Sequence, residues 1–404
     1  MSTVRRAVHV ALLASVVVTA AVAGIGARAG DYLLGFTAPG SAGGSAYDGL
    51  AYASPGPHGV GVRRIGPSEA PVAMTVWYPA AGEPDEEPSA RYSYALAVLD
   101  EAAPTAVATY AGSAVHDAPA ASGGPYPLVL LSAGFAITPE SYAWLAEHLA
   151  SHGMVVVAPR HEETLDPSQL SEATIERPET IAEARRYITG DAAPMDLRRL
   201  VDADRVAVLG HSLGGYAALA AAGARPDPEA FRSGCTGARL EDDPIVFLCD
   251  ALEPRFDEIV AANRPEVAPV DAVVSLAGDA AMFGADGLSA ITAPLLAIGG
   301  TADRDSPFEW STRLAYDGAA SAHKVEVALE GAGHLVFAGG CGSVRRIVLL
   351  VPLGLCDDPG WDRADARTVV RHHVAGFLLA ELAVDPSGAV TTRAVLVRPA
   401  DAPR

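Results

Sequence analysis

The chain has 404 residues, half of them hydrophobic, which is enough for a large core arranged as one or two domains. Its 29 Lys and Arg residues stand against 49 Asp and Glu residues, so the formal net charge is −20 at pH 7. This charge repels the phosphate backbone of nucleic acids, and no run of basic residues offsets it. We therefore expect no nucleic-acid partner.

Residues 1–29 have the pattern of a targeting segment. Arg5 and Arg6 precede an apolar stretch that runs to about Ile25, and Ala27-Arg-Ala29 resembles a signal-peptide cleavage site. The apolar stretch is long for a signal peptide and near the minimum length for a membrane span. We predict a cleaved signal peptide and a secreted or extracytoplasmic protein, with an uncleaved N-terminal membrane anchor as the alternative.

The rest of the chain divides into a linker, one domain and a tail. Residues 30–56 are rich in Gly, Ala and Ser, which predicts a flexible linker. The domain is expected over residues 57–384, beginning with paired antiparallel strands at 60–63 and 72–78. Residues 385–404 are interpreted as a C-terminal tail or an additional edge strand.

Strands and helices alternate from residue 126 onward, after a Pro- and Ala-rich stretch without clear periodicity. The predicted strands are 128–131, 154–158, 206–209, 272–276, 295–298 and 325–329, and the predicted helices are 141–151, 179–188, the segment after Ser212, and 364–382. This alternation predicts an α/β fold with a mainly parallel central sheet flanked by helices.

A G-x-S-x-G motif, Gly210-His-Ser212-Leu-Gly214, lies between an apolar strand and an Ala-rich helix. This is the context of a nucleophile elbow, in which the serine adopts a strained backbone conformation and flanking glycines avoid a clash. The pentapeptide also occurs in ordinary Gly/Ser loops. In this setting, however, it predicts that Ser212 is a catalytic nucleophile.

In enzymes with this elbow, an acid and then a histidine follow the serine along the chain. Asp303 comes just after the strand at 295–298, where a parallel sheet collects its functional groups, and we predict that it orients the base. Asp305 is its nearest competitor, and Asp279, after the preceding strand, remains the alternative acid.

Four histidines follow Asp303, and only His334 lies in a glycine-rich loop directly after a strand. His323 precedes that strand, while His372 and His373 fall within the last predicted helix. We therefore predict that His334 takes the proton of the serine hydroxyl.

An oxyanion hole needs two preset backbone N–H donors. One is expected at Leu213, directly after the nucleophile. The other is expected at Phe135, in the loop after the strand at 128–131, where Gly134 lets the backbone turn toward the substrate.

The segments 126–135, 142–159, 210–215, 299–303 and 331–334 resemble the bacterial platelet-activating-factor acetylhydrolase-like and dienelactone-hydrolase-like members of the α/β-hydrolase superfamily. The resemblance covers about residues 59–383. It implies the α/β-hydrolase fold and cleavage of carboxylic esters through an acyl-enzyme, without a metal or an organic cofactor. The implied substrate is a small-molecule or lipid ester, with a short acyl group or an acetylated phospholipid-like structure, and a lipid substrate would bring the enzyme to a membrane surface.

Two departures from the family leave details open. Many relatives have His where this chain has Ala133, and the eukaryotic acetylhydrolases draw their acid from an earlier strand, a segment that Asp279-Ala-Ala-Met-Phe283 resembles. Dienelactone hydrolases more usually have a Cys nucleophile, so Ser212 favours an ester.

Other functions remain as alternatives. The same fold can act on a polyester, lactone, thioester or amide, and a hydrolase scaffold can serve as a non-catalytic binding protein. The sequence has no H-E-x-x-H motif and no His or Cys cluster at ligand spacing, so we expect no metal. His161-Glu-Glu163 is interpreted as a solvated loop, with lining of the substrate cleft as the alternative. The oligomeric state stays open.

The four cysteines allow three pairings, and we favour the two local ones, Cys235–Cys249 and Cys341–Cys356. Each pairing would close a loop of about 15 residues, worth about 3 kcal/mol in the chain-entropy model. Disulfides fit the predicted export, because they persist in oxidising compartments.

Overall fold

The computed structural model describes residues 47, 49–81, 90–98, 100–263, 269–338, 360–382 and 393–399. The predicted leader and the cysteine pair Cys341–Cys356 lie outside the described residues. Among the described helices, none is both long enough and apolar enough to cross a membrane.

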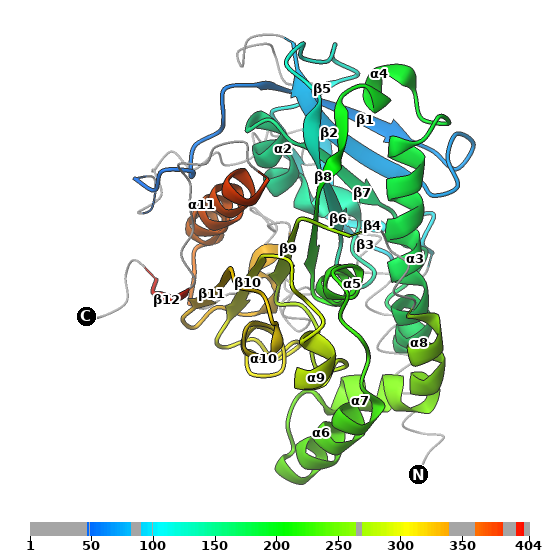
Figure 1. Ribbon diagram of the computed structural model, residues 1–404, viewed down its shortest axis with the longest axis vertical. Helices are drawn as coiled ribbons and strands as arrows, with labels where there is room; N and C mark the ends of the chain where they lie inside the picture. The colour runs from blue at the N-terminus through cyan, green and yellow to red at the C-terminus, as the bar shows by residue number, and fades with distance from the viewer. Residues whose placement is uncertain are drawn as a thin grey trace, which may run out of the picture.

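A ten-stranded sheet runs through the middle of the molecule (Figure 1). Its strands, in spatial order, are β12 (Arg393–Val397), β11 (Lys324–Leu329), β10 (Leu295–Gly300), β9 (Ala272–Leu276), β8 (Val201–His211), β6 (Tyr126–Ser132), β7 (Val155–Pro159), β2 (Met74–Ala80), β1 (Gly59–Ile65) and β5 (Val115–His116). The strands from β12 to β7 are parallel, whereas β2 is antiparallel to β7 and β1 is antiparallel to β2. The predicted α/β-hydrolase fold class is confirmed, including its N-terminal antiparallel strands.

Helices cover both faces of this sheet. On one face lie α2 (Ala143–Ser151) and α11 (Arg363–Glu381), and on the other lie α3 (Leu170–Thr189), α5 (Leu213–Ala221) and α10 (Thr312–Gly318) (Figure 1). Successive side chains of a strand point to opposite faces, so each strand serves two cores. In β6, Leu128 and Leu130 join the core under α3 and α5, while Val129 and Leu131 join the core under α2 and α11.

Several short elements connect the larger ones. They are α4 (Met195–Arg198), α9 (Gly284–Leu288), and the 3₁₀ helices η1 (Pro139–Tyr142), η2 (Pro167–Gln169), η3 (Glu253–Arg255) and η4 (His334–Phe337). Two of them matter for the site, because η1 follows the loop after β6 and η4 begins at the predicted catalytic histidine.

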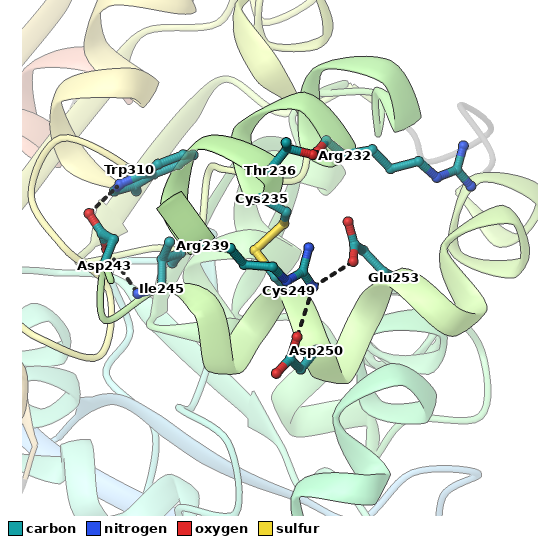
Figure 2. The surroundings of a disulfide bond; sticks show 10 residues. All are labelled: Arg232, Cys235, Thr236, Arg239, Asp243, Ile245, Cys249, Asp250, Glu253 and Trp310. Carbon is teal, nitrogen blue, oxygen red and sulfur yellow. Dashed lines mark hydrogen bonds and ion pairs between the residues drawn. A yellow bond between two sulfur atoms is a disulfide. The ribbon is translucent and has the colours of Figure 1, made fainter. Parts of the chain in front are cut away.

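A helical excursion between α5 and β9 has no counterpart in the predicted elements. It consists of α6 (Pro228–Glu241), α7 (Val246–Leu252) and α8 (Phe256–Ala262). Asp227 caps α6 by accepting the backbone N–H groups of Glu229 and Ala230. The predicted disulfide Cys235–Cys249 is present and joins α6 to α7 (Figure 2).

A two-stranded hairpin, β3 (Arg91–Leu96) and β4 (Thr105–Ala111), occupies the segment that showed no periodicity. Tyr92 and Tyr94 of β3 are buried, and the Tyr92 hydroxyl accepts a hydrogen bond from Trp77 Nε1 at 2.9 Å. The formation of these strands therefore depends more on contacts with the main sheet than on the hydrophobic pattern of their own sequence.

Both ends of the predicted domain extend further than expected. Tyr52 stacks on His372 of α11, Ala53 is buried, and the Ser54 carbonyl lies 3.1 Å from His152 Nε2. The C-terminal part of the predicted linker thus packs on the domain. At the other end, β12 supplies the additional edge strand that was the alternative to a tail.

Candidate active site

Ser212 occupies a sharp turn between the last residue of β8, His211, and the first residue of α5, Leu213. Its φ of 57° and ψ of −126° are strained for a residue with a side chain, at a typical cost of about 1–3 kcal/mol. The backbone on either side leaves no room for a Cβ: one at Gly210 would lie 1.9 Å from the Gly214 carbonyl oxygen, and one at Gly214 would lie 2.1 Å from the Ser132 carbonyl oxygen. The G-x-S-x-G sequence therefore forms the predicted elbow.

A buried histidine–carboxylate pair lies at the carboxyl ends of β10 and β11. His334 Nδ1 is 2.7 Å from Asp303 Oδ2, and the two side chains are 8% and 1% exposed. The other oxygen of Asp303 accepts the backbone N–H groups of Asp305 and Ser306, both at 2.9 Å, which fixes the carboxylate. Because Nδ1 faces the carboxylate, Nε2 is the ring nitrogen left for a substrate or nucleophile.

The charges around His334 determine its protonation. Burial by itself lowers the pKa of this imidazole, but the negative charge of Asp303, its hydrogen bond, and the charges of Asp305 and Asp279 raise the pKa to about 9. The site thus strongly stabilises an imidazolium, which is the state that a general base reaches after accepting a proton.

Asp279, the alternative acid, lies close by but has other partners. Its backbone N–H donates to the Ser212 carbonyl at 3.3 Å, and its carboxylate accepts the hydroxyl of Ser306. Burial raises its pKa to about 6, against the lowering effect of the Ser306 hydrogen bond. Within the described part of the chain, the carboxylate hydrogen-bonded to His334 is that of Asp303, and Asp305 contacts this pair through its backbone.

His211, the residue before the nucleophile, connects the serine to the histidine loop. Its Nε2 donates to the His334 carbonyl at 3.1 Å, and the two imidazole rings are 4.7 Å apart. Its Nδ1 accepts the Tyr142 hydroxyl at 2.7 Å, and burial lowers the pKa of His211 well below its usual value. His211 was not among the predicted site residues, and its position beside Ser212 is the one sequence signal for it.

The predicted triad members therefore meet at one edge of the sheet, though not as a continuous hydrogen-bonded chain. Among the described residues, no hydrogen bond joins Ser212 Oγ to His334. In ligand-free sites these contacts are often long and shorten when substrate binds.

Both predicted oxyanion donors are available. Leu213 is the first residue of α5, so its N–H has no partner within the helix. The N–H of Gly134 donates to the Tyr142 hydroxyl at 3.0 Å, whereas the N–H of Phe135 donates to no other group in the described ranges. In the described ranges, the N–H groups of Leu213 and Phe135 are thus both left without a protein acceptor.

The interpretation of His161-Glu-Glu163 as a solvated loop holds for Glu162, which is exposed, and is wrong for its two neighbours. His161 Nε2 lies 2.9 Å from Ser132 Oγ, and Glu163 is 5% exposed beside Arg177 of α3. Arg177 lies fourteen residues after Glu163, and the packing of α3 brings the two side chains together. The sequence around His161 therefore gave no sign of this ion pair. In the described ranges, no group of three or more His, Cys, Asp or Glu side chains is arranged to hold a metal ion.

Comparisons with known proteins give matches over part of the chain. A family described as Chlorophyllase matches residues 99–230, a segment that contains Phe135, Ser212 and Leu213. The chain is 39% identical over 105 residues to "Cutinase est1" of Thermobifida alba, which covers 26% of this chain and 33% of that protein. It is 37% identical over 105 residues to "Cutinase cut1" of Thermobifida fusca, covering 26% and 31%.

A fourth similarity is to "Bis(hydroxyethyl) terephthalate hydrolase" of Streptomyces coelicolor, 32% identical over 125 residues, covering 31% of this chain and 37% of that protein. The chain thus spans about a third of the length of the curated relatives it matches. These names support the expectation of an ester hydrolase, and none of them is a platelet-activating-factor acetylhydrolase.

Proposed function

We propose that the chain is a serine hydrolase that cleaves carboxylic esters, with Ser212 as nucleophile, His334 as general base and Asp303 as the acid that orients it. The observation that carries the proposal is the placement of a strained serine elbow at the same sheet edge as a buried His–Asp pair joined at 2.7 Å. The similarity to proteins named cutinase and bis(hydroxyethyl) terephthalate hydrolase supports the ester as the bond that is cleaved.

In the first half of the reaction, Ser212 Oγ attacks the ester carbonyl carbon while His334 Nε2 accepts the hydroxyl proton. The carbonyl oxygen becomes an oxyanion and is stabilised by the N–H groups of Phe135 and Leu213. Asp303 holds the imidazole in the required tautomer and stabilises the imidazolium. When the tetrahedral intermediate collapses, the bond to the alkoxy group breaks, and His334 returns its proton to the departing alcohol.

In the second half, water releases the acyl group from Ser212. His334 accepts a proton from the water as its oxygen attacks the acyl carbon, and the same two N–H groups stabilise the second oxyanion. Collapse of this intermediate protonates Ser212 Oγ and yields the carboxylic acid. No further reactant is required.

For the substrate, we propose an ester with a short acyl group, which includes an acetylated phospholipid-like ester. A small aromatic ester of the bis(hydroxyethyl) terephthalate kind is the second candidate, favoured by the similarity to the Streptomyces enzyme. Polyesters, lactones, thioesters and amides remain alternatives, because a triad of this kind can act on each of them.

The test compares the wild-type chain with Ser212→Ala on p-nitrophenyl acetate, bis(hydroxyethyl) terephthalate and an acetylated glycerophospholipid. We expect turnover by the wild type and a loss on the order of 10⁶-fold in kcat for the variant. Ser289→Ala is the matched control, because this hydroxyl is exposed and, among the described residues, bonds only to the Asp286 carbonyl, at 2.6 Å. Undiminished turnover in Ser212→Ala would contradict the assignment, and a wild type that binds esters without cleaving them would favour a binding protein.

We also propose that the protein is exported. The disulfide Cys235–Cys249 supports an oxidising compartment, since such bonds are rare where thiols are kept reduced. Comparison of the N-terminus of the mature protein with the predicted cleavage after residue 29 tests whether the leader is removed.

A further inference from the structure

The loop of residues 133–137, which carries Phe135 and is called here the oxyanion loop, is held by a buried ion pair from outside it. Arg177 of α3 and Glu163, which follows β7, are 1% and 5% exposed. Both groups are therefore removed from water, and their charges are satisfied by each other and by the backbone of the loop.

The ion pair contacts the oxyanion loop on both sides of Phe135. Arg177 Nη1 donates to the Ala133 carbonyl, while its Nε donates to Glu163 Oε2 at 3.1 Å and its Nη2 to Glu163 Oε1. The same Glu163 Oε1 accepts the backbone N–H of Ala136 at 2.7 Å. One guanidinium and one carboxylate thus fix the carbonyl before Gly134 and the N–H after Phe135.

The loop conformation requires such support. Ala136 has a φ of 56°, in the left-handed region that an alanine adopts only at a cost in energy. Its carbonyl accepts the N–H of Ala97 at 2.8 Å, and the turn is closed by the Ile137 N–H on the Gly134 carbonyl at 3.1 Å. With Glu163 on the Ala136 N–H, the strained residue is held at both of its backbone polar groups.

The hydrogen bonds along the loop single out one donor. The N–H of Gly134 is bound by Tyr142 and that of Ala136 by Glu163, so in the described structure Phe135 has the free N–H between them. A buried ion pair is weak evidence for stability, because desolvation of the two charges offsets much of their attraction. The contacts of this ion pair with the oxyanion loop indicate instead that it holds the loop backbone in place.

We propose that Glu163 and Arg177 are positioning residues, which act through the loop backbone to aim the Phe135 N–H at the oxyanion of the reaction. The proposal rests on the proposed ester hydrolysis. It assigns these residues no contact with substrate. Their effect is to be expected in the stabilisation of the tetrahedral intermediate and not in the binding of the ester.

The test measures kcat and KM for p-nitrophenyl acetate in Arg177→Lys, Arg177→Met and Glu163→Gln. Loss of one aligned oxyanion donor lowers turnover by about 10²–10³-fold, and we expect this range for both Arg177 variants with KM changed less than about threefold. Lysine keeps the charge but lacks the planar fork that reaches Glu163 and the Ala133 carbonyl together, so it should not restore activity. The affinity for a boronic acid, which forms a tetrahedral adduct with the serine, should fall in parallel with kcat.

Glu326→Gln is the matched control. This carboxylate is also buried, with its side chain 2% exposed, and pairs with Arg313 at 2.8 Å, but it lies on β11 away from the oxyanion loop. We expect it to change the melting temperature and leave kcat and boronic-acid affinity unchanged. Glu163→Gln keeps the side-chain volume and an acceptor for the Ala136 N–H. It is the variant expected to fold if the Arg177 variants do not, with kcat at least about tenfold lower.

The outcomes separate the two proposals. A wild type without ester turnover refutes the proposed function and the positioning role with it. Wild-type turnover combined with a full kcat in Arg177→Lys or in folded Glu163→Gln refutes the positioning role alone. A parallel loss of kcat and boronic-acid affinity, absent from Glu326→Gln, supports it.

Discussion

Replacement of Asp303 by Asn would remove the negative charge beside His334 while keeping the shape of the side chain. In the structure, the Asp303 carboxylate accepts a 2.7 Å hydrogen bond from His334 Nδ1, and both side chains are buried. Burial opposes the imidazolium, yet the surrounding carboxylates raise the pKa of His334 from 6.5 to about 9. That rise corresponds to roughly 3 kcal/mol in favour of the protonated ring.

We expect Asp303→Asn to lower kcat by on the order of 10⁴-fold, the loss typical of this substitution in a Ser-His-Asp triad. The pH profile should change as well. Only neutral His334 can accept a proton, so the wild-type kcat/KM should rise with pH until about 9. In Asp303→Asn, the lost charge lowers the pKa of the histidine, and the rise should move to lower pH.

The assay is hydrolysis of p-nitrophenyl acetate from pH 5 to pH 10, with the rate of Ser212→Ala subtracted as background. Asp279→Asn is the matched comparison, because Asp279 is buried at the same sheet edge but hydrogen-bonds to Ser306. It should keep kcat within about tenfold of the wild type. The reasoning fails if Asp303→Asn retains its activity and Asp279→Asn loses it, since Asp279 would then be the acid.

Two predictions concern stability. Burial raises the pKa of Asp279 from 3.8 to about 6, so the charged carboxylate costs folding energy above that pH, and the cost disappears below about 4. Urea unfolding should therefore find Asp279→Asn more stable than the wild type by about 3 kcal/mol at pH 8 and nearly equal to it near pH 4. Equal stability at pH 8 would contradict this. The double variant Cys235→Ser with Cys249→Ser should lose about 3 kcal/mol of unfolding free energy, because the disulfide closes a loop with a sequence separation of 14. Reductant should bring the wild type to the same urea midpoint. In both cases kcat should stay within about twofold of the untreated wild type.

The sequence predicted the parts of the site whose signals are local. The strand before Gly210, the glycines around Ser212 and the Ala-rich helix are contiguous, and the elbow geometry follows from them. Asp303 and His334 were predicted to lie together because each follows an apolar strand and parallel strands end at the same edge of a sheet, and the structure places their side chains 2.7 Å apart.

The parts that were missed depend on distant partners. His161-Glu-Glu163 has the composition of a solvated loop, and only the packing of α3 brings Arg177 onto Glu163. The hairpin of β3 and β4 likewise has little pattern of its own, and Tyr92 is placed by the indole of Trp77. Burial by tertiary contacts overrode local composition in both places.

The strand β12 forms one edge of the ten-stranded sheet and covers the side of β11 that would otherwise be the edge. All five of its residues are exposed or half-buried, with Arg393 exposed, whereas five of the six residues of β11 beside it are buried. An apolar strand left at an edge offers free N–H and C=O groups to other chains and promotes aggregation, and charged or very short edge strands suppress this. At the opposite edge, β5 has only two residues. By pairing with β11, β12 satisfies the backbone groups on the outer side of the strand that leads to His334, and it becomes the sheet edge itself, with Leu396 53% exposed.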